Sequence, residues 1–415
     1  MALLFLCLIF GTGRTQKIEA AVQNVPESLE EESRLDTVGT DQETERAAVR
    51  EKKGQQEKEA GDTETDQAAA AQDELLAELD FDAIQQEVDS LLSSQQFSFA
   101  GTVRSLLQDG DPFRTFRAGN AVLSCAKTAF LAQKGLMKEL FLLVLAGAVL
   151  GSFSSLFEGK QVRDASFYMV YLLALALILK NFQSSGENLK AVITSLVAFM
   201  RILTPSYYLA AGGASSAVMF YQMLLLVILA VEKLLLALVL PMIHIYLLIA
   251  LVNDLSGEEI LSHMTELLET CVNGLLKSSL GVLVGMQMIR NLIAPALDSL
   301  RQMALWRTAG MIPGIGNAVN AVTELVAGSA VLIRNCFGVT AMLVLLAAGM
   351  VPAVQLLVSG LSFRLLAAAA QPVSDKRIAG CLAAAGKGYA MLLRLLLTVE
   401  VLFLLTIAIL AGTFS

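Results

Sequence analysis

From Leu136 to Ser415 the chain consists of one apolar segment after another, interrupted by proline, glycine and isolated charged residues. Hydrophobic residues make up 55% of the whole chain and charged residues only 16%, whereas a soluble domain carries about 25% charged residues. Since one membrane crossing needs about 20 apolar residues, the pattern predicts an all-α, polytopic helical membrane protein with about six to eight spans. A bilayer tolerates interrupted helices only where protein or a water-filled cavity satisfies the freed backbone groups, so some spans are expected to be broken or re-entrant.

The apolar segments that we expect to form these helices differ in how well they suit a complete membrane crossing. Leu189–Leu203 contains Arg201 and is expected to stop at Pro205, entering the bilayer without crossing it. Two further segments are separated only by Val231, Glu232 and Lys233, so they form either one long helix or two halves; these are Val218–Ala230 and Leu234–Val252. The other expected segments are Glu139–Phe157, Phe167–Phe182, Leu275–Leu297, Ile315–Ile333, Cys336–Leu361 and Tyr389–Leu410.

Charge divides the chain into two unlike parts. Residues 17–113 hold 24 acidic and 8 basic side chains, whereas residues 114–415 hold 14 acidic and 21 basic ones, as is typical of spans flanked by cytoplasmic cations. From this pattern and the apolar spacing we predict five regions: a signal-like or anchor segment (1–20), an acidic disordered spacer (21–72), a small amphipathic helical extracytoplasmic module (73–112), an interfacial amphipathic helix (113–138) and a helical transmembrane domain (139–415). The module is too small to form its own core, so we expect it to dock on another part of the protein.

The charged loops also suggest a topology. Residues 253–270 carry five acidic side chains and no Lys or Arg, which favours the outside, although acidic residues count for little in this rule. Residues 364–387 hold Arg364, Lys376, Arg377 and Lys387 and are expected inside. The two assignments agree only if an odd number of crossings separates them.

Two stretches resemble each other in layout and predict an internal repeat of about 110 residues, with candidate units 190–300 and 301–412, because duplicated units with discontinuous helices build many transport folds. Pro205 and Pro241 bound an apolar stretch in the first unit, as Pro313 and Pro352 do in the second. The alternative is that Leu-rich membrane sequences resemble each other by chance.

The second unit contains the most informative interruption, Ile312-Pro313-Gly314-Ile315-Gly316-Asn317. Proline and the two glycines Gly314 and Gly316 are expected to stop one helix, and the side chain of Asn317 can cap the next. Asn317, Asn320 and Glu324 then fall on one helical face, upstream of Arg334. This polar face predicts either a cavity or re-entrant hairpin, or polar packing against another helix.

Isolated charged residues within or beside the spans are further candidates, because such groups pair, snorkel or face water. Glu400 is the one placed deepest in its span and is the most suggestive. The others are Arg201, Glu232, Lys233, Arg290, Arg334, Arg364 and Arg394, most of them near span ends, where snorkelling is the better interpretation.

Motifs for enzyme chemistry are missing from the sequence. There is no P-loop, HExxH, GxSxG or Gly-rich dinucleotide turn. The two histidines, His244 and His263, are interpreted as structural, and the five scattered cysteines contain no CxxC pair. We therefore predict no catalytic residue, no metal site and no cofactor, and any use of ATP must come from a partner. Nucleic acid is not an expected ligand.

The C-terminal half resembles a known family. Met311-Ile312-Pro313-Gly314-Ile315-Gly316 leads into the polar helix, and a strong span ends at Val351-Pro352-Ala353-Val354. Ala369-Ala370-Gln371-Pro372-Val373-Ser374-Asp375 and Ala384-Ala385-Gly386-Lys387 follow, before a last span that ends at Ala411-Gly412. This layout is similar to that of the stage III sporulation protein AE family of endospore-forming bacteria. The likeness is most specific over residues 300–412, and the long acidic spacer departs from it.

The resemblance implies an integral membrane component of the channel complex that joins mother cell and forespore, located in the mother-cell membrane that surrounds the forespore. It implies as partners the lipid bilayer, the other stage III sporulation membrane and ring-forming proteins, and their cytoplasmic ATPase. The family supplies no catalytic residue to carry over. A permease-like or platform subunit is the first hypothesis. A stand-alone secondary transporter and a purely structural scaffold for ring proteins are the alternatives.

Overall fold

A computed structural model describes most of the chain after residue 80. The described residues are 81–92, 97–109, 118–154, 160–210, 226–256, 261–309, 316–372 and 374–412. They all belong to the second of two compact units, Asp66–Ser415. The predicted anchor segment (1–20) and acidic spacer (21–72) lie outside the described residues, and so does the start of the amphipathic module.

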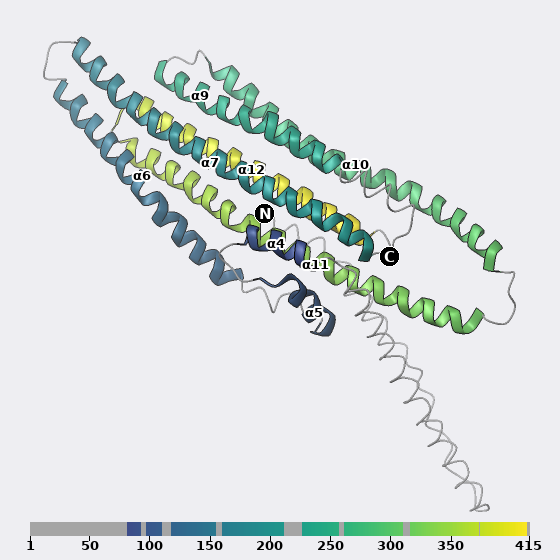
Figure 1. The fold of residues 1–415 in the computed structure, drawn as a ribbon. Helices are drawn as coiled ribbons and strands as arrows, with labels where there is room; N and C mark the ends of the chain where they lie inside the picture. The colour runs from purple at the N-terminus through teal and green to yellow at the C-terminus, as the bar shows by residue number, and fades with distance from the viewer. Residues whose placement is uncertain are drawn as a thin grey trace, which may run out of the picture. The chain divides into compact units, whose positions relative to one another are not determined.

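The described residues form helices and no strand, which confirms the all-α class. Two short helices come first, α4 (Phe81–Leu91) and α5 (Phe99–Asp109). Long helices follow, and Figure 1 shows them running alongside one another: α6 (Ala118–Ser154), α7 (Lys160–Ala210), α9 (Leu240–Ser256, preceded by helical residues from 226), α10 (Ser262–Ala309), α11 (Gly316–Ala370) and α12 (Lys376–Gly412).

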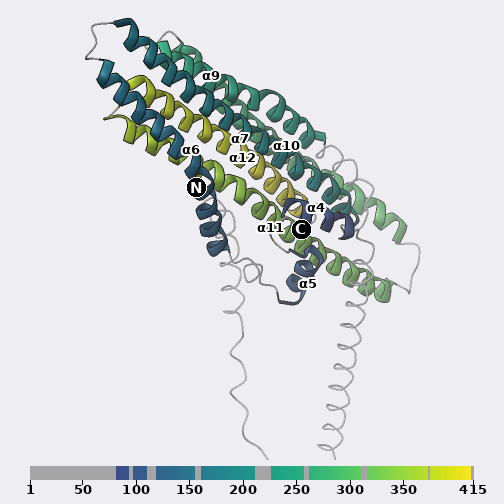
Figure 2. The ribbon, with the colours of Figure 1, turned by 60° about the vertical axis from the view of Figure 1, so that its left-hand side comes forward.

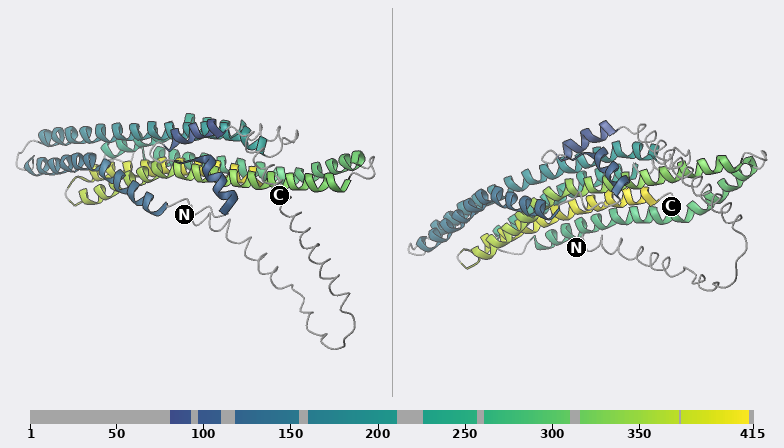
Figure 3. Two further views of the ribbon diagram at one scale, coloured as in Figure 1. Left: turned by 60° about the horizontal axis from the view of Figure 1, so that its bottom comes forward. Right: turned by 90° about the horizontal axis from the view of Figure 1, so that it is seen from below.

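The C-terminal helix α12 is at the centre of this arrangement. It contacts α7, α9, α10 and α11, while α11 also contacts α6 and α7. Figures 2 and 3 show the same neighbours from other sides. Helices α11 and α12 approach closely where two glycines face each other: a Cβ placed at Gly386 would lie 3.2 Å from the carbonyl oxygen of Gly360. Small residues at such a crossing let two membrane helices pack backbone to backbone.

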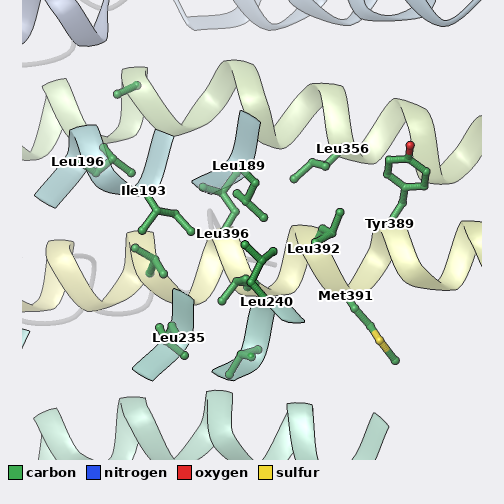
Figure 4. Packing of buried hydrophobic residues seen from close by; sticks show 14 of the residues in the cluster. Leu189, Ile193, Leu196, Leu235, Leu240, Leu356, Tyr389, Met391, Leu392 and Leu396 are labelled. Atoms are coloured by element: carbon green, nitrogen blue, oxygen red, sulfur yellow. The ribbon is translucent and has the colours of Figure 1, made fainter. Parts of the chain in front are cut away.

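Buried aliphatic side chains from four helical segments fill the centre of the bundle. Figure 4 shows Leu189, Ile193 and Leu196 of α7 facing Leu392 and Leu396 of α12. Leu235, Leu240 and Leu356 close the same cluster from the neighbouring helices. Because these positions recur at helical spacing, each helix presents a continuous apolar stripe to its neighbours.

Five helices within the described residues are long and apolar enough to cross a membrane: Phe167–Pro205, Leu226–Ser256, Ser262–Met286, Val331–Ala370 and Lys376–Leu410. Large apolar side chains also cover their outer surfaces, among them Met169, Leu172, Leu248, Leu361 and Leu365. Helices that are apolar on the outside as well as toward their neighbours are typical of a protein solvated by lipid. The exact number of crossings, the span Glu139–Phe157 and the internal repeat stay predictions.

Two expected breaks between helices are absent. Phe167–Phe182 and Leu189–Leu203 are joined in the single helix α7, whose intervening residues 183–188 are polar yet helical. One helix, α6, likewise covers the described parts of the predicted interfacial helix (113–138) and of the span that follows it. Polar residues do not break a helix whose other faces pack, because tertiary packing supplies most helical stability.

The two short helices dock on the bundle. Helix α4 contacts α7, and α5 contacts α11. The rings of Phe81, Phe99 and Phe337 form one aromatic cluster, with centroids of Phe99 and Phe337 5.0 Å apart at 76° and those of Phe81 and Phe337 6.3 Å apart. The side-chain oxygen of Gln85 accepts the backbone N–H of Phe99 at 2.8 Å, which ties α5 to α4. The α4–α5 module is thus held by a small apolar interface on α7 and α11.

Candidate functional site

The predicted helix breaks at two prolines are wrong. Pro205 lies inside α7, which continues to Ala210, and Pro352 lies inside α11, which continues to Ala370. A proline removes one helix hydrogen bond and crowds the preceding turn. In a packed bundle of long helices that local loss is outweighed by the contacts of the remaining turns, so neither helix ends.

Pro241 has a different local structure. The five residues Leu235–Val239 just before it form a π-helical turn, and α9 continues from Leu240. A π-helical turn lets a helix continue through a local irregularity. The two predicted halves Val218–Ala230 and Leu234–Val252 are therefore joined, over the described residues from 226, in one helix that winds more widely at this point.

The predicted polar face after Pro313 is only partly described. Pro313 and Gly314 lie outside the described residues, and Gly316 is the first residue of α11. The backbone at Asn317, Asn320 and Glu324 is helical, but their side chains are outside the described part. Arg334, further along α11, is buried. The cavity or re-entrant hairpin proposed for this segment stays a prediction.

Glu400 is buried within α12 and faces α11. Only 7% of its surface is exposed. A side-chain carbon at Gly349 of α11 would overlap the Glu400 carboxyl group, so the glycine makes the space that the carboxyl occupies. Among the predicted candidates, Glu400 and Arg334 are thus charged residues that the structure places in the interior, whereas Arg201 and Pro205 are exposed.

A polar cluster that the sequence does not single out lies between α7 and α12. The Asn181 side-chain amide donates to the Tyr389 hydroxyl at 2.7 Å, and the Ser185 hydroxyl lies 3.3 Å from the same oxygen. The ring of Tyr389 is fully buried, stacked on Phe363 at 5.3 Å and edge-on to Phe182 at 5.2 Å. Buried polar groups that satisfy one another in this way fix the register of two helices.

His244 lies beside this cluster, on α9. Its Nδ1 is 2.8 Å from the carbonyl oxygen of Leu240, one turn earlier in the same helix, and its ring packs edge-on against Phe182 at 5.2 Å. These contacts agree with the structural interpretation of this histidine. Within the described residues no group of three or more His, Cys, Asp or Glu side chains is placed to hold a metal ion.

An ion pair joins α10 to α12. The Lys387 Nζ and a carboxylate oxygen of Glu269 are 2.5 Å apart, and Lys387 also lies 5.9 Å from the ring centroid of Tyr246. Asn273, one turn after Glu269 on α10, accepts a hydrogen bond from the Arg394 guanidinium at 3.2 Å through its side-chain oxygen. Helix α10, on the outer side of α12, is therefore attached through polar contacts as well as apolar ones.

This ion pair contradicts the predicted topology. Glu269 belongs to the loop expected outside and Lys387 to the segment expected inside, yet the two side chains meet. A Cβ at Gly380 would likewise lie 3.1 Å from the carboxyl carbon of Asp254. Both segments are thus at the same end of the bundle, and two helices, α10 and α11, connect them. The charge rule failed because Asp and Glu carry little weight in it.

Further contacts at that end join α7, α9 and α12. The Tyr171 hydroxyl donates to the carbonyl oxygen of Leu251 at 2.5 Å, and the Arg377 guanidinium lies 5.4 Å from the ring centroid of Phe167. A carboxylate oxygen of Asp375 accepts the backbone N–H of Arg377 at 3.0 Å and so caps the start of α12. The described polar groups therefore connect helices to one another. Their arrangement suits the assembly of a bundle more than covalent chemistry.

Comparison with known proteins identifies a family whose sequences resemble this chain. The sequence profile described as stage III sporulation protein AE matches residues 97–413. A relative from Bacillus subtilis (strain 168), also named stage III sporulation protein AE, is 22% identical over 291 residues, which cover 69% of this chain and 73% of the relative. No solved structure matches.

Proposed function

Since the chain belongs to the stage III sporulation protein AE family, we propose that it is a multi-pass membrane component of the channel complex that joins mother cell and forespore. In this proposal it is located in the mother-cell membrane around the forespore and serves as a non-catalytic, permease-like or platform subunit. Ring-forming proteins and a cytoplasmic ATPase of the same sporulation stage are its partners, and the ATPase supplies the energy.

The observation that carries this proposal is the set of five long helices that are apolar outside as well as inside. Such helices need lipid or other membrane helices around them. The sequence also lacks nucleotide-binding and hydrolase motifs, which fits a subunit that depends on a partner for energy. The docked α4–α5 module offers a folded surface outside the spans through which ring proteins can attach.

Complementation with co-purification tests the proposal. A spore-forming host that lacks its own family member is given this chain with an affinity tag, and membranes are solubilised after engulfment. We expect restored heat-resistant spores and co-purification of the other stage III membrane and ring-forming proteins. Restoration of neither, from a chain that is present in the membrane in normal amounts, would refute the channel role.

Two further measurements separate the three forms of the hypothesis. Uptake of a defined solute by the purified protein alone in liposomes would show a stand-alone secondary transporter. Glu324→Gln and Glu400→Gln test the permease-like form, because a charge reversal would place an unpaired cation at the buried Glu400 and destabilise the bundle by itself. Deletion of residues 73–112 tests the platform form. A scaffold predicts that the deletion abolishes sporulation while both substitutions leave it intact; a permease-like subunit predicts that the substitutions abolish it.

A further inference from the structure

Glu400 is a buried acid, and no oppositely charged side chain pairs with it in the part of the chain that the structure describes. No hydrogen bond or ion pair to its carboxyl group occurs among the described residues. Burying an unpaired carboxylate costs far more than burying the neutral acid, and charged side chains inside membrane helices pair or mark a functional site. The carboxyl group therefore needs either a proton or a partner.

Pro352 leaves one carbonyl group of α11 without its usual donor, and that group belongs to the residue before the glycine that faces Glu400. Proline has no N–H, so the carbonyl group four residues earlier, that of Ala348, lacks its helical donor. Ala348 is buried, and Pro352, which lies four residues later in the same helix, cannot supply the usual donor to its carbonyl oxygen. Buried carbonyl groups are nearly always paired. Ala348 directly precedes Gly349, the residue whose missing side chain makes room for the Glu400 carboxyl group.

The charged groups that the structure describes on neighbouring helices do not supply an ion-pair partner for Glu400. On α12 itself, Arg394 is exposed and bound to Asn273. On α11, Arg334 and Arg364 are each 15 residues from Gly349, which is about 22 Å along a helix. The other described charged groups on the helices packed against α12 are exposed or partly exposed; they include Lys190 and Arg201 on α7, Glu232 and Lys233 before α9, and Glu266, Glu269 and Lys277 on α10.

We propose that Glu400 and the carbonyl group of Ala348 form a proton-binding site between α11 and α12. The neutral carboxylic acid donates its O–H to the carbonyl oxygen that Pro352 leaves free. Gly349 permits the approach. One carboxyl and one carbonyl group are too few for a hard metal cation, which takes about six oxygen ligands, whereas a single proton needs only this donor and acceptor. Loss of the proton leaves a buried charge and an unpaired carbonyl group, so protonation links α11 to α12. The proposal does not depend on the role in sporulation.

Infrared difference spectroscopy tests the proton directly. The full-length protein and its Glu400→Gln variant are reconstituted in lipid nanodiscs at neutral pH. We expect the variant to lose the C=O stretch of one protonated carboxylic acid. Loss of the two stretches of an ionised carboxylate instead would overturn the proposal. Because the Gln amide can also donate to the carbonyl group, the variant is expected to fold with nearly the wild-type Tm, and failure to fold would count equally against the site.

A double-mutant cycle tests the partner. Glu400→Ala removes the donor and is expected to lower the Tm of the otherwise wild-type protein. In a Pro352→Ala background the new backbone N–H of residue 352 pairs with the Ala348 carbonyl group, so at least half of that loss should disappear. Pro205→Ala is the matched control, since Pro205 lies in α7 and is exposed. Equal losses of Tm in all three backgrounds would refute the pairing.

Discussion

Phe337 is expected to hold the α4–α5 module on the bundle. Its ring is fully buried and contacts both Phe99 and Phe81. Two such ring contacts contribute about 1–3 kcal/mol beyond the burial of apolar surface. Phe337→Ala removes them and leaves a cavity, which raises the total cost to about 3–5 kcal/mol, shared between docking and the packing of α11 itself.

Loss of docking should also unfold the module. Helices α4 and α5 have 11 residues each, and isolated helices shorter than about 12–15 residues are marginal in water. A docking loss of about 1–3 kcal/mol corresponds to a factor of about 5–150 in the opening equilibrium. Amide hydrogen exchange of the full-length protein in detergent reports that factor over residues 81–109, and trypsin cleavage at the exposed Arg104 gives a second readout.

The control for this experiment is Leu361→Ala in the same helix, because Leu361 is 56% exposed. It should leave exchange in the module unchanged. The reasoning is refuted if Phe337→Ala leaves exchange of α4 and α5 within twofold of the wild-type protein while α11 itself stays folded by the same measurement.

Two further predictions concern the polar contacts of α12. Tyr389→Phe leaves the Asn181 amide without its acceptor and should destabilise the protein by about 1–2 kcal/mol, measured as a lower Tm in detergent; an unchanged Tm would show that the amide finds another partner. Lys387→Glu and Glu269→Lys should each lower the Tm slightly and restore it when combined, with a coupling of only about 0.5 kcal/mol because half of the Lys387 side chain is exposed. Additive losses would contradict the pairing.

Composition and periodicity were sufficient for the fold class. Residues such as Leu189, Ile193 and Leu196 recur at helical spacing, and these are the positions that the structure buries. An apolar excess over so long a stretch leaves membrane helices as the consistent outcome, because every backbone group in lipid must be satisfied within its own helix. The family resemblance depended on local sequence alone, and the comparisons confirm it.

Proline positions were a poor guide to helix ends. Pro205 and Pro352 show the strongest helix-breaking signal that a single residue can give, yet both lie within helices. The preference of one residue is a local term of a few kcal/mol at most. Packing along tens of residues of helix is a larger, non-local term, and a single sequence contains no direct record of it.

The candidate site was also predictable from the sequence only in part. Glu400 was recognisable from sequence because a charge deep in an apolar segment is costly wherever the segment packs. Its neighbours were not recognisable: Gly349 is one of 30 glycines, and only the crossing of α11 and α12 shows which one makes room for the acid. Asn181 and Tyr389 are 208 residues apart, and nothing in their local sequence indicates the hydrogen bond between them.

By itself, then, the sequence determined that the chain forms apolar helices, which family it belongs to, and which acid is costly to bury, because these follow from local composition and spacing. The tertiary structure alone decided that the helices continue through Pro205 and Pro352, that Glu269 and Lys387 lie at the same end of the bundle, and which groups face Glu400. Those outcomes depend on contacts between residues far apart in the chain, where the packing energy of whole helices exceeds the preference of any one residue.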